Sequence, residues 1–543
     1  MITLPRVKLS RSSFFLGAKL KTNWGFIGLL ILAVTYYLAF IFRTTLPVSE
    51  NGITTRYYTL FDDAMISMRY AWNLSHGVGL VWNPGEYVEG YTNPLTVLMM
   101  TVVTFFFNKS LSVLVVQLLN IFILTAIGFF SAQITLNVIK GKNKTEQTLL
   151  KLIGVGAALG YFPIFYWSLL GMETGLLTLL ELAGIWSVFK FVDNPSKARG
   201  SLIGLLLGLA FLARPDSLVM TAPILLYLVY ETYTLENSSK NQKLYYLAFT
   251  FGITFAIIAA QELFRLFYYG DLVPNTYTLK ATGMPLKDKI LNGIGFIGPF
   301  ILETWPVLFL ATLGLILNFN RKCLLFYGIM VALIGYEIYV GGDAWNYWRI
   351  LCPAIPLLFV VIANLFFGKL RLRPLVSTLG LIVLLLVINA RFLPEMSLTQ
   401  EINSLHYSLR EYTKIEVLNE VCYPDATIGM ITAGAIPYYT GLKGIDFLGK
   451  MDKHIAQLPA DLSGAMAKIG TYSLSGHNKY DLNYSIKELK PDFVEQFGWG
   501  SQDIWEWGKQ YYEEVTINKF SFYFLKDSPR IKWNVIARLQ SET

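Results

Sequence analysis

Residues 24–42 read WGFIGLLILAVTYYLAFIF, a run that contains no charged side chain. A helix needs about 20 apolar residues to cross the hydrocarbon core of a bilayer, so this run predicts a transmembrane helix. Similar runs recur as far as residue 393. We expect about 11 spans, at residues 24–42, 111–139, 152–170, 174–191, 201–215, 216–231, 244–268, 301–319, 323–340, 350–367 and 375–393.

The composition agrees with a polytopic membrane protein. Of the 543 residues, 54% are hydrophobic and 15% are charged, and the mean hydropathy is +0.46. Soluble domains carry about 25% charged residues. The net charge of +8 is spread over loops and forms no basic patch with interleaved aromatic rings, so we expect no nucleic-acid partner. Cys323, Cys352 and Cys422 lie far apart, which argues against a disulfide framework and a structural zinc site.

Basic residues predict the orientation of the spans. Arg6, Lys8, Arg11, Lys19 and Lys21 precede the first span, and no small-x-small cleavage site follows it, so we expect a retained helix with a cytoplasmic N-terminus. Further basic clusters occupy alternate loops at 140–144, 190–199, 240–243, 321–322 and 369–373. All of them are cytoplasmic if the 14-residue apolar run 94–107 does not cross the membrane by itself. We therefore expect that run at the interface, or as the first part of a broken helix with 111–139.

The chain changes character at residue 394, where charged residues become frequent and apolar runs shorten. Residues 426–431, 444–448, 491–494 and 520–525 predict strands, and 434–439 predicts a turn into a short helix. We expect residues 1–393 to form a transmembrane core with a first outer loop at 43–93. Residues 394–543 are then a soluble α/β domain on the outer face. The predicted fold class is thus a polytopic α-helical membrane protein with a C-terminal soluble α/β domain.

With this orientation, five polar segments share the outer face with the C-terminal domain. They are residues 43–93, 171–174, 214–216, 269–300 and 341–349. Charged residues beside a bilayer are costly and tend to be functional. Their convergence on one face predicts an active cleft there.

An adjacent carboxylate pair, Asp62 and Asp63, follows the first span. Consecutive side chains point in different directions, so one carboxylate can face a reaction centre while the other accepts hydrogen bonds. Glycosyl transfer needs a base for the acceptor proton, and a carboxylate can also hold a divalent cation near a leaving phosphate. The alternative is a helix N-cap with an acid in the first turn. The following loop, 76–94, is rich in glycine, proline and aromatic rings and favours the functional interpretation.

Three basic residues on the predicted outer face are candidates for binding a phosphate. Arg349 opens an apolar run beside Trp345, Lys280 ends a polar loop, and Arg214 lies beside Asp216. Guanidinium and ammonium groups both suit a phosphate. Each residue also has a structural interpretation: Arg349 as an interfacial anchor, Lys280 as a snorkelling side chain, and Arg214 as the ion-pair partner of Asp216.

Other candidates rest on weaker signals. Glu173, at a tight turn between two spans, is a second acidic position or an acid at a helix N-terminus. His477 lies in the polar cluster 476–481 and acts in proton transfer, orients the acceptor, or is structural.

These motifs, in this order, resemble the GT-C superfamily of polyprenyl-phosphate-dependent glycosyltransferases. The likeness is strongest to the terminal β-arabinofuranosyltransferases of mycobacterial cell-wall arabinan (AftB-type). It covers nearly the whole chain, through DDAMIS at 62–67, RYA at 69–71, GLVWNPGEYVEGYTNP at 79–94, GMET at 171–174, ARPD at 213–216, GDLVPNTY at 270–277, GGD at 341–343, AGAIPYY at 433–439 and GHNKYD at 476–481.

The resemblance implies transfer of a sugar, arabinofuranose or another, from a polyprenyl-phosphate donor to a glycan, lipid or protein acceptor. It implies a multi-pass protein of the bacterial inner membrane with its active site on the periplasmic face. The catalytic carboxylate of the first outer loop falls on Asp62 or Asp63. We favour Asp62 as the proton acceptor and Asp63 as the orienting or binding residue, with His477 as a further catalytic candidate.

The remaining site residues are divided between donor and substrate. Donor and phosphate binding is expected of Arg349, Arg214, Lys280, Asp343 and Trp345. Substrate binding is expected of Glu89, Tyr91, Asn93, Glu173, Asp271 and Lys479. The sequence establishes no cofactor, and a divalent metal is left open. The alternative function is a lipid-linked glycan transporter or flippase without transferase activity.

Overall fold

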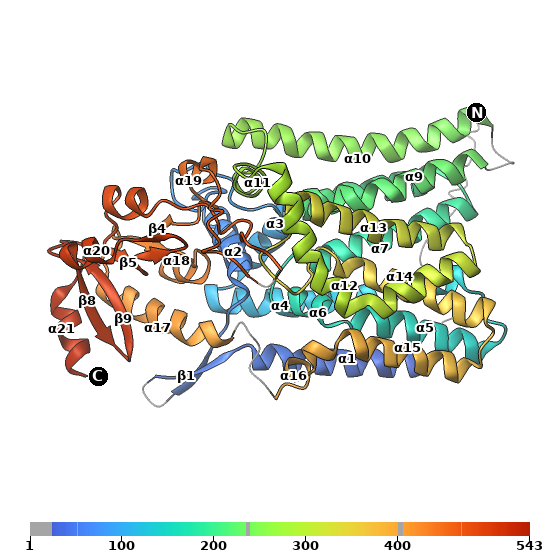
Figure 1. The fold of residues 1–543 in the computed structure, drawn as a ribbon, viewed down its shortest axis with the longest axis horizontal. Coiled ribbons are helices and arrows are strands. Elements are labelled where there is room, and N and C mark those ends of the chain that lie inside the picture. The colour runs from blue at the N-terminus through green and yellow to red at the C-terminus, as the bar shows by residue number, and fades with distance from the viewer. Residues whose placement is uncertain (1–23, 51–52, 235–238, 400–404, 469, 543) are drawn as a thin grey trace, which may run out of the picture.

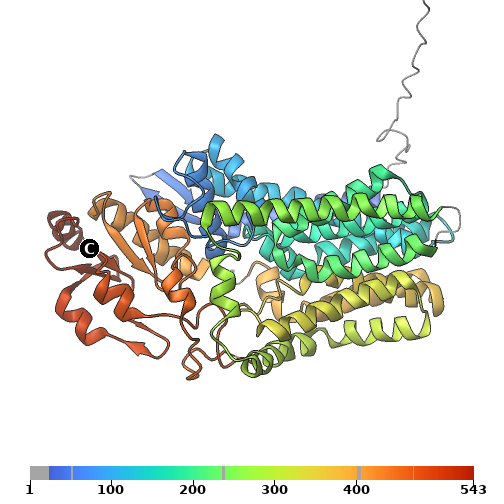
Figure 2. The same ribbon diagram turned by 90° about the horizontal axis from the view of Figure 1, so that it is seen from above.

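Long helices and a separate sheet dominate the fold of this chain (Figure 1). The computed structural model describes residues 24–50, 53–234, 239–399, 405–468 and 470–542. The basic residues expected on the cytoplasmic side before the first span lie outside the described residues. The long helices run side by side in one half of the molecule, and the sheet lies beyond their ends (Figures 1 and 2).

Among the described residues, seven segments are long and apolar enough to cross a membrane. They are α1 (Trp24–Arg43), α4 (Lys109–Val138), α7 (Thr174–Asp193), α10 (Lys240–Tyr269), α12 (Leu286–Leu317), α13 (Arg321–Val340) and the segment Cys352–Lys369, made of η2 (Cys352–Ala354), α14 (Ile355–Ala363) and the π-helical η3 (Asn364–Lys369). The number rises to nine with two bent pairs. These are α5 (Lys144–Leu159) with α6 (Phe162–Leu169), bent by 55°, and α15 (Pro374–Ile388) with η4 (Ala390–Phe392) and α16 (Leu393–Met396), bent by 62°.

The fold class predicted from the sequence is confirmed, with differences in the details of the spans. The expected count of about 11 also includes α8 (Lys197–Ala213) and α9 (Leu218–Thr234), which are separated by η1 (Pro215–Ser217). Each has 17 residues, at the short end of the range for a spanning helix. The run 94–107 is a separate short helix, α3 (Pro94–Phe106), because the Asn108 side chain caps the start of α4.

The predicted polar loop 269–300 is largely helical, which the sequence analysis missed. It contains α11 (Asn275–Ala281) and the start of α12 at Leu286. Pro285 precedes α12 and Asp288 lies in its first turn, both favourable features of a helix N-terminus. Polar residues at a helix start were interpreted as loop residues because the apolar run begins only later.

The C-terminal sheet has five strands in the order β4-β3-β5-β9-β8. The strands are β3 (Thr427–Met430), β4 (Lys443–Asp446), β5 (Phe493–Val494), β8 (Tyr512–Ile517) and β9 (Phe520–Leu525). β3 is parallel to β4 and to β5, whereas β9 is antiparallel to β5 and to β8. Strands predicted near β3, β4, β5 and β9 are present, and β8 was missed.

Shorter elements complete the outer part of the chain. They are the hairpin β1 (Leu46–Glu50) and β2 (Ile53–Tyr57), α2 (Asp62–Ser75), α17 (Leu405–Val421), α18 (Ala435–Thr440), α19 (Lys453–Gln457), η5 (Asn483–Glu488), the pair β6 (Gly498–Trp499) and β7 (Gln502–Asp503), α20 (Trp505–Tyr511) and α21 (Trp533–Ser541). In Figure 1, α2, α3, α11 and α19 lie between the long helices and the sheet.

Buried polar contacts join the first outer loop to the C-terminal part of the chain. Arg69 on α2 is buried, and its guanidinium donates to the carbonyls of Trp82 (2.6 Å), Leu442 (2.8 Å) and Pro437. The Asn83 side chain exchanges two hydrogen bonds with the backbone of Gly444, at 2.8 and 3.0 Å. Buried polar groups must be satisfied in this way, so these contacts fix α2 and its loop against the region of β4 and α18.

Replacing Arg69 with methionine is expected to lower the stability by about 3 kcal/mol, because several buried carbonyl oxygens lose their donor. The measurement is thermal unfolding in detergent, together with the rate at which trypsin releases the C-terminal part. Lys509→Met is the control, since Lys509 forms only an exposed pair with Glu506. Equal unfolding temperatures for R69M and K509M would contradict this role of Arg69.

Candidate active site

A pocket with about 450 Å³ of empty volume lies where α2, α11 and the ends of several spans meet. Seven residues singled out from the sequence line it: Asp63, Tyr91, Asn93, Glu173, Arg214, Lys280 and Arg349. Lys450, which the sequence analysis did not single out, lines it as well. The pocket thus combines two carboxylates with four basic side chains, which suits a phosphate-bearing ligand.

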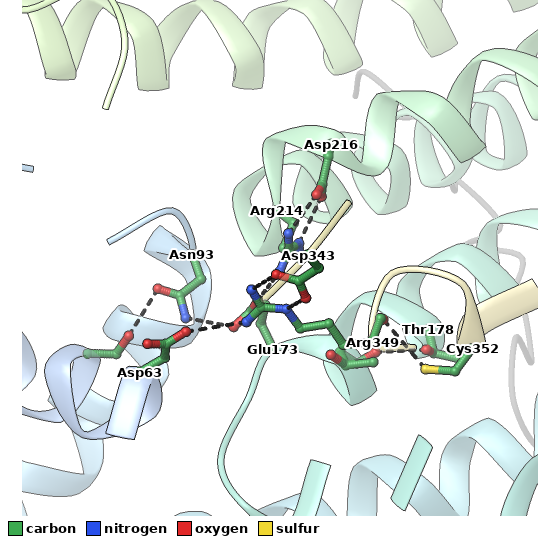
Figure 3. A network of polar contacts seen from close by, with 11 residues as sticks. Asp63, Asn93, Glu173, Thr178, Arg214, Asp216, Asp343, Arg349 and Cys352 are labelled. Atoms are coloured by element: carbon green, nitrogen blue, oxygen red, sulfur yellow. Dashed lines mark hydrogen bonds and ion pairs between the residues drawn. The ribbon is translucent and has the colours of Figure 1, made fainter. Parts of the chain in front are cut away.

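Asp63 is held by two cations from distant parts of the chain, Lys450 and Arg349, of which Figure 3 shows Arg349. Lys450 pairs with its Oδ1, and a terminal nitrogen of Arg349 lies 3.4 Å from its Oδ2. Arg349 is itself fixed by two hydrogen bonds to Asp343, at 2.5 and 2.7 Å. Burial alone would raise the pKa of Asp63, but Lys450, Arg349 and Lys280 together hold it well below its usual value. Asp63 is therefore an ionised carboxylate.

A second network surrounds Arg214 (Figure 3). Its guanidinium binds Asp216 at 2.6 and 2.8 Å and Glu173 at 2.5 Å. The other oxygen of Glu173 accepts from the Asn93 amide at 3.0 Å, and Asn93 accepts from Ser67 at 3.1 Å. Two carboxylates neutralise Arg214, so it has no surplus charge for a phosphate. The ion-pair interpretation of Arg214 and Asp216 describes this geometry.

Lys280 is the cation without a partner in this pocket. No hydrogen bond or ion pair of its ammonium group occurs within the part of the chain that the structure describes. Burial, and then the charge of Arg349, lower its pKa to about 8. The hydroxyl of Thr276, one turn earlier on the same face of α11, is buried and also lacks a partner. Lys280 and Thr276 together offer a ligand a cation and a hydroxyl.

Asp62 points to a different part of the molecule. Its Oδ1 accepts from the backbone N–H groups of Gly434 (2.9 Å) and Ala435 (3.2 Å) at the start of α18. It does not line the pocket. Burial raises the pKa of Asp62 to about 7, against the lowering effect of Lys450 and the two N–H groups. Asp62 thus makes a contact with the start of α18, whereas Asp63 lines the pocket.

His477 and Trp345 do not line the pocket, although the charges of Lys450, Asp63 and Lys280 act on His477. Their rings meet edge to face, 5.9 Å apart, and neither the His477 Nδ1 nor the Trp345 Nε1 has a hydrogen-bond partner among the described residues. Burial, followed by the charge of Lys450, lowers the pKa of His477 to about 3. The imidazole is therefore neutral at neutral pH and can accept a hydrogen bond.

The other three substrate-binding candidates have structural contacts outside the pocket. Glu89 pairs with buried Arg265 at 2.5 Å, and Asp271 pairs with Lys453 at 2.6 Å in an exposed position. The Lys479 ammonium donates to three oxygens of neighbouring segments, at 2.6, 3.0 and 3.2 Å. None of these three residues lines the pocket.

The pocket does not have the donor set of a metal site. No group of three or more His, Cys, Asp or Glu side chains is placed to hold a metal ion in the described ranges. Asp63 and Glu173, the two carboxylates of the lining, are each bound by basic side chains. A divalent cation would have to displace those partners.

Comparisons with known proteins agree with this architecture. Residues 146–259 match the family described as dolichyl-phosphate-mannose-protein mannosyltransferase, and residues 400–530 match a domain of unknown function (DUF8728). No curated protein has significant sequence similarity to the chain. The structure resembles apo ArnT from Cupriavidus metallidurans, with a TM-score of 0.51 and 12% identity over 78% of this chain and 87% of ArnT. The chain has the GT-C fold.

A second GT-C structure resembles this protein over a larger part of the chain. This is the archaeal oligosaccharyltransferase AglB from Archaeoglobus fulgidus, solved with an inhibitory peptide and a dolichol-phosphate, with a TM-score of 0.50 and 12% identity. The match covers 94% of this chain and 75% of AglB. The family match and these two structures support the GT-C superfamily expected from the sequence, and the apolar helices support a multi-span membrane protein, whereas the AftB-like subtype stays a prediction.

The docking contact of Asp62 makes a testable prediction about pH. Its folded pKa of about 7 lies above the unfolded value of about 3.9, so the stability it contributes is present below about pH 4 and is lost as the pH rises through 7. Asp62→Asn keeps the acceptor oxygen and removes the titration. The unfolding temperature of Asp62→Asn minus that of the wild type should therefore increase as the pH is raised from about 4 to about 7. Tryptophan fluorescence in detergent follows the unfolding.

Asp62→Ala provides the matched control for this prediction. It removes the acceptor of both N–H groups and should be less stable than Asp62→Asn at every pH. A difference between Asp62→Asn and the wild type that does not change with pH would show that Asp62 does not titrate in this range.

Proposed function

We propose that this chain is an integral membrane glycosyltransferase that moves a sugar from a polyprenyl-phosphate donor to an acceptor on the outer face of the membrane. The observation that carries the proposal is the pocket in which ionised Asp63 meets Arg349 and the unpartnered Lys280. The GT-C fold supports it, as do ArnT and AglB, solved respectively as an apo enzyme and with a dolichol-phosphate.

In the proposed reaction, Asp63 is the general base. It takes the proton of an acceptor hydroxyl while that oxygen forms a bond to the anomeric carbon of the sugar. The bond between the anomeric carbon and the phosphate oxygen breaks, and its electron pair remains on the leaving phosphate. Position favours Asp63 over Asp62, because Asp63 lines the pocket and the Asp62 oxygen is bound to the start of α18. We therefore propose Asp63, and not Asp62, as the base.

The leaving phosphate gains one negative charge as Asp63 loses one. Among the described residues Lys280 has no hydrogen-bond or ion-pair partner, and Arg349 is close enough for its charge to lower the pKa of Lys280, so these two residues are the proposed phosphate ligands. Fixed cations in a site partly closed to water stabilise such charge strongly. Asp343 orients Arg349, and Trp345 with neutral His477 forms the proposed edge at which the acceptor enters.

The remaining lining residues are proposed to contact the transferred sugar. Tyr91 and Asn93 present a ring and an amide, and Glu173 is held in place by Arg214. We propose that Glu89, Asp271 and Lys479 act indirectly, by bracing the loop and helix behind these groups. The resemblance to AftB-type enzymes favours arabinofuranose as the sugar and the periplasmic face of a bacterial inner membrane as the location.

Asp63→Asn is expected to reduce transfer by about 100-fold or more, because amides do not accept a proton in general base catalysis. The reconstituted protein is given labelled undecaprenyl-phosphate arabinofuranose, or the corresponding mannose donor as an alternative, and the labelled product is measured. Asp62→Asn should stay within about tenfold of the wild type. Wild-type rates in Asp63→Asn would refute the assignment, and lipid-linked sugar crossing the bilayer untransferred would favour the transporter.

Lys280→Met is expected to weaken binding of undecaprenyl phosphate by about 10-fold to 100-fold, the range for losing a hydrogen bond to a charged group. The dissociation constant can be measured by tryptophan fluorescence in detergent. Lys287→Met is the control, because Lys287 is an exposed lysine in the first turn of α12. Equal affinities of Lys280→Met and Lys287→Met would exclude Lys280 as a phosphate ligand.

A further inference from the structure

One charged residue of the pocket comes from the part of the chain that carries the sheet. Asp63 belongs to α2, Lys280 to α11, and Arg349 to the segment before η2, whereas Lys450 follows β4. The Lys450 side chain is only 11% exposed, and its ammonium pairs with Asp63. A surface lysine would keep its ammonium in water, so this burial requires a specific role.

The turn that carries Lys450 is fixed by contacts on two sides. The Asp446 carboxylate accepts two backbone N–H groups within the turn, at 2.9 and 3.0 Å. The Asn275 amide, at the start of α11, donates to three carbonyls of the turn, including that of Lys450 at 3.0 Å. α11 also carries Lys280. These contacts fix the backbone of Lys450 relative to α11, and therefore relative to Lys280, the proposed phosphate ligand.

We propose that Lys450 is a positioning residue for Asp63, supplied by the outer domain, and that the active pocket is complete only when this domain is docked. The proposal rests on the function proposed above. Lys450 holds the carboxylate in one orientation and keeps it ionised in the empty pocket. When the proton of the acceptor moves to Asp63 and the electron pair moves to the phosphate, Lys450 loses its anionic partner as a new anion forms beside it.

The neighbours of Asp63 decide what the loss of Lys450 does. The charged and titratable groups that face it or line the same pocket are Lys450, Arg349, Lys280, Asp62, His477, Glu173, Arg214 and Tyr91. Burial raises the pKa of Asp63, and Lys450 is the largest effect that lowers it. Without Lys450, the pKa of Asp63 should rise, so that the carboxylate becomes protonated when the pH falls. Protonated Asp63 no longer repels a phosphate.

The test measures the affinity of the full-length protein for undecaprenyl phosphate at about pH 5 and about pH 8. The variants are Lys450→Met, Lys450→Arg, Asp63→Asn and the double variant of Lys450→Met with Asp63→Asn. Lys443→Met is the matched control, because Lys443 lies on β4 just before the turn and forms only an exposed pair with Glu86. The titration of the phosphate itself is common to all variants.

The ratio of the dissociation constants at high and low pH should be about tenfold larger in Lys450→Met than in the wild type. It should be unchanged in Lys450→Arg and Lys443→Met, and the double variant should match Asp63→Asn alone. A ratio in Lys450→Met equal to that of the wild type would overturn the proposal. So would an enlarged ratio that persists in the double variant, because the titrating group would then not be Asp63.

A second measurement does not depend on whether Lys450→Met folds. Acetic anhydride acetylates lysines with free amines, and mass spectrometry gives the rate at Lys450. Asp63→Asn should accelerate this acetylation about tenfold, since loss of the ion pair lowers the pKa of Lys450. An unchanged rate would overturn the pairing. If the rate changes but undecaprenyl phosphate does not bind, the donor assignment fails while the coupling of Lys450 to Asp63 stands.

Discussion

An ionised carboxylate beside a bilayer persists only where cations compensate it, and in this protein that carboxylate is Asp63. Lys450 forms an ion pair with one oxygen of this carboxylate and Arg349 with the other, and an ion pair with Asp343 holds Arg349 in place. These residues come from parts of the chain that are far apart in sequence. The proposed chemistry therefore depends on α2, the ends of the spans and the segment after β4 coming together, and none of these parts contains a complete site.

The first outer loop is the element that joins the other two parts. Successive residues of a helix point about 100° apart, so Asp62 and Asp63 leave α2 in different directions. Asp62 binds the start of α18, and Arg69, about two turns further on, binds carbonyls on both sides of the same interface. Both carboxylates lie in the first turn of α2, but neither caps that helix, and Asp62 instead accepts N–H groups at the start of α18. Asp62, which binds α18, and Asp63, the proposed base, therefore lie in the same turn of α2.

The sequence predicted much of this fold and part of the candidate site. Hydropathy identified the long spans, and apolar runs of strand length identified four strands of the C-terminal sheet. Both are visible in the sequence because buried segments are rich in apolar residues. Charged residues beside spans identified most of the charged lining of the pocket. Lys450 was missed because a lysine in a turn normally lies in water, and its partner is almost 400 residues away. The division of roles between Asp62 and Asp63 depends on tertiary contacts, which adjacent identical residues cannot reveal.

The distribution of charge also bears on the order of events in the proposed reaction. In the empty pocket, Lys450 and Arg349 hold the pKa of Asp63 so low that it is a poor base. A donor phosphate bound by Lys280 and Arg349 competes with Asp63 for Arg349, and every hydrogen bond that Arg349 gives to the phosphate weakens its hold on Asp63. The basicity of Asp63 then rises in the presence of the donor and rises further as the phosphate gains charge. On this argument the donor, rather than the acceptor, activates the base, and a pocket without donor has little power to deprotonate an acceptor hydroxyl or water.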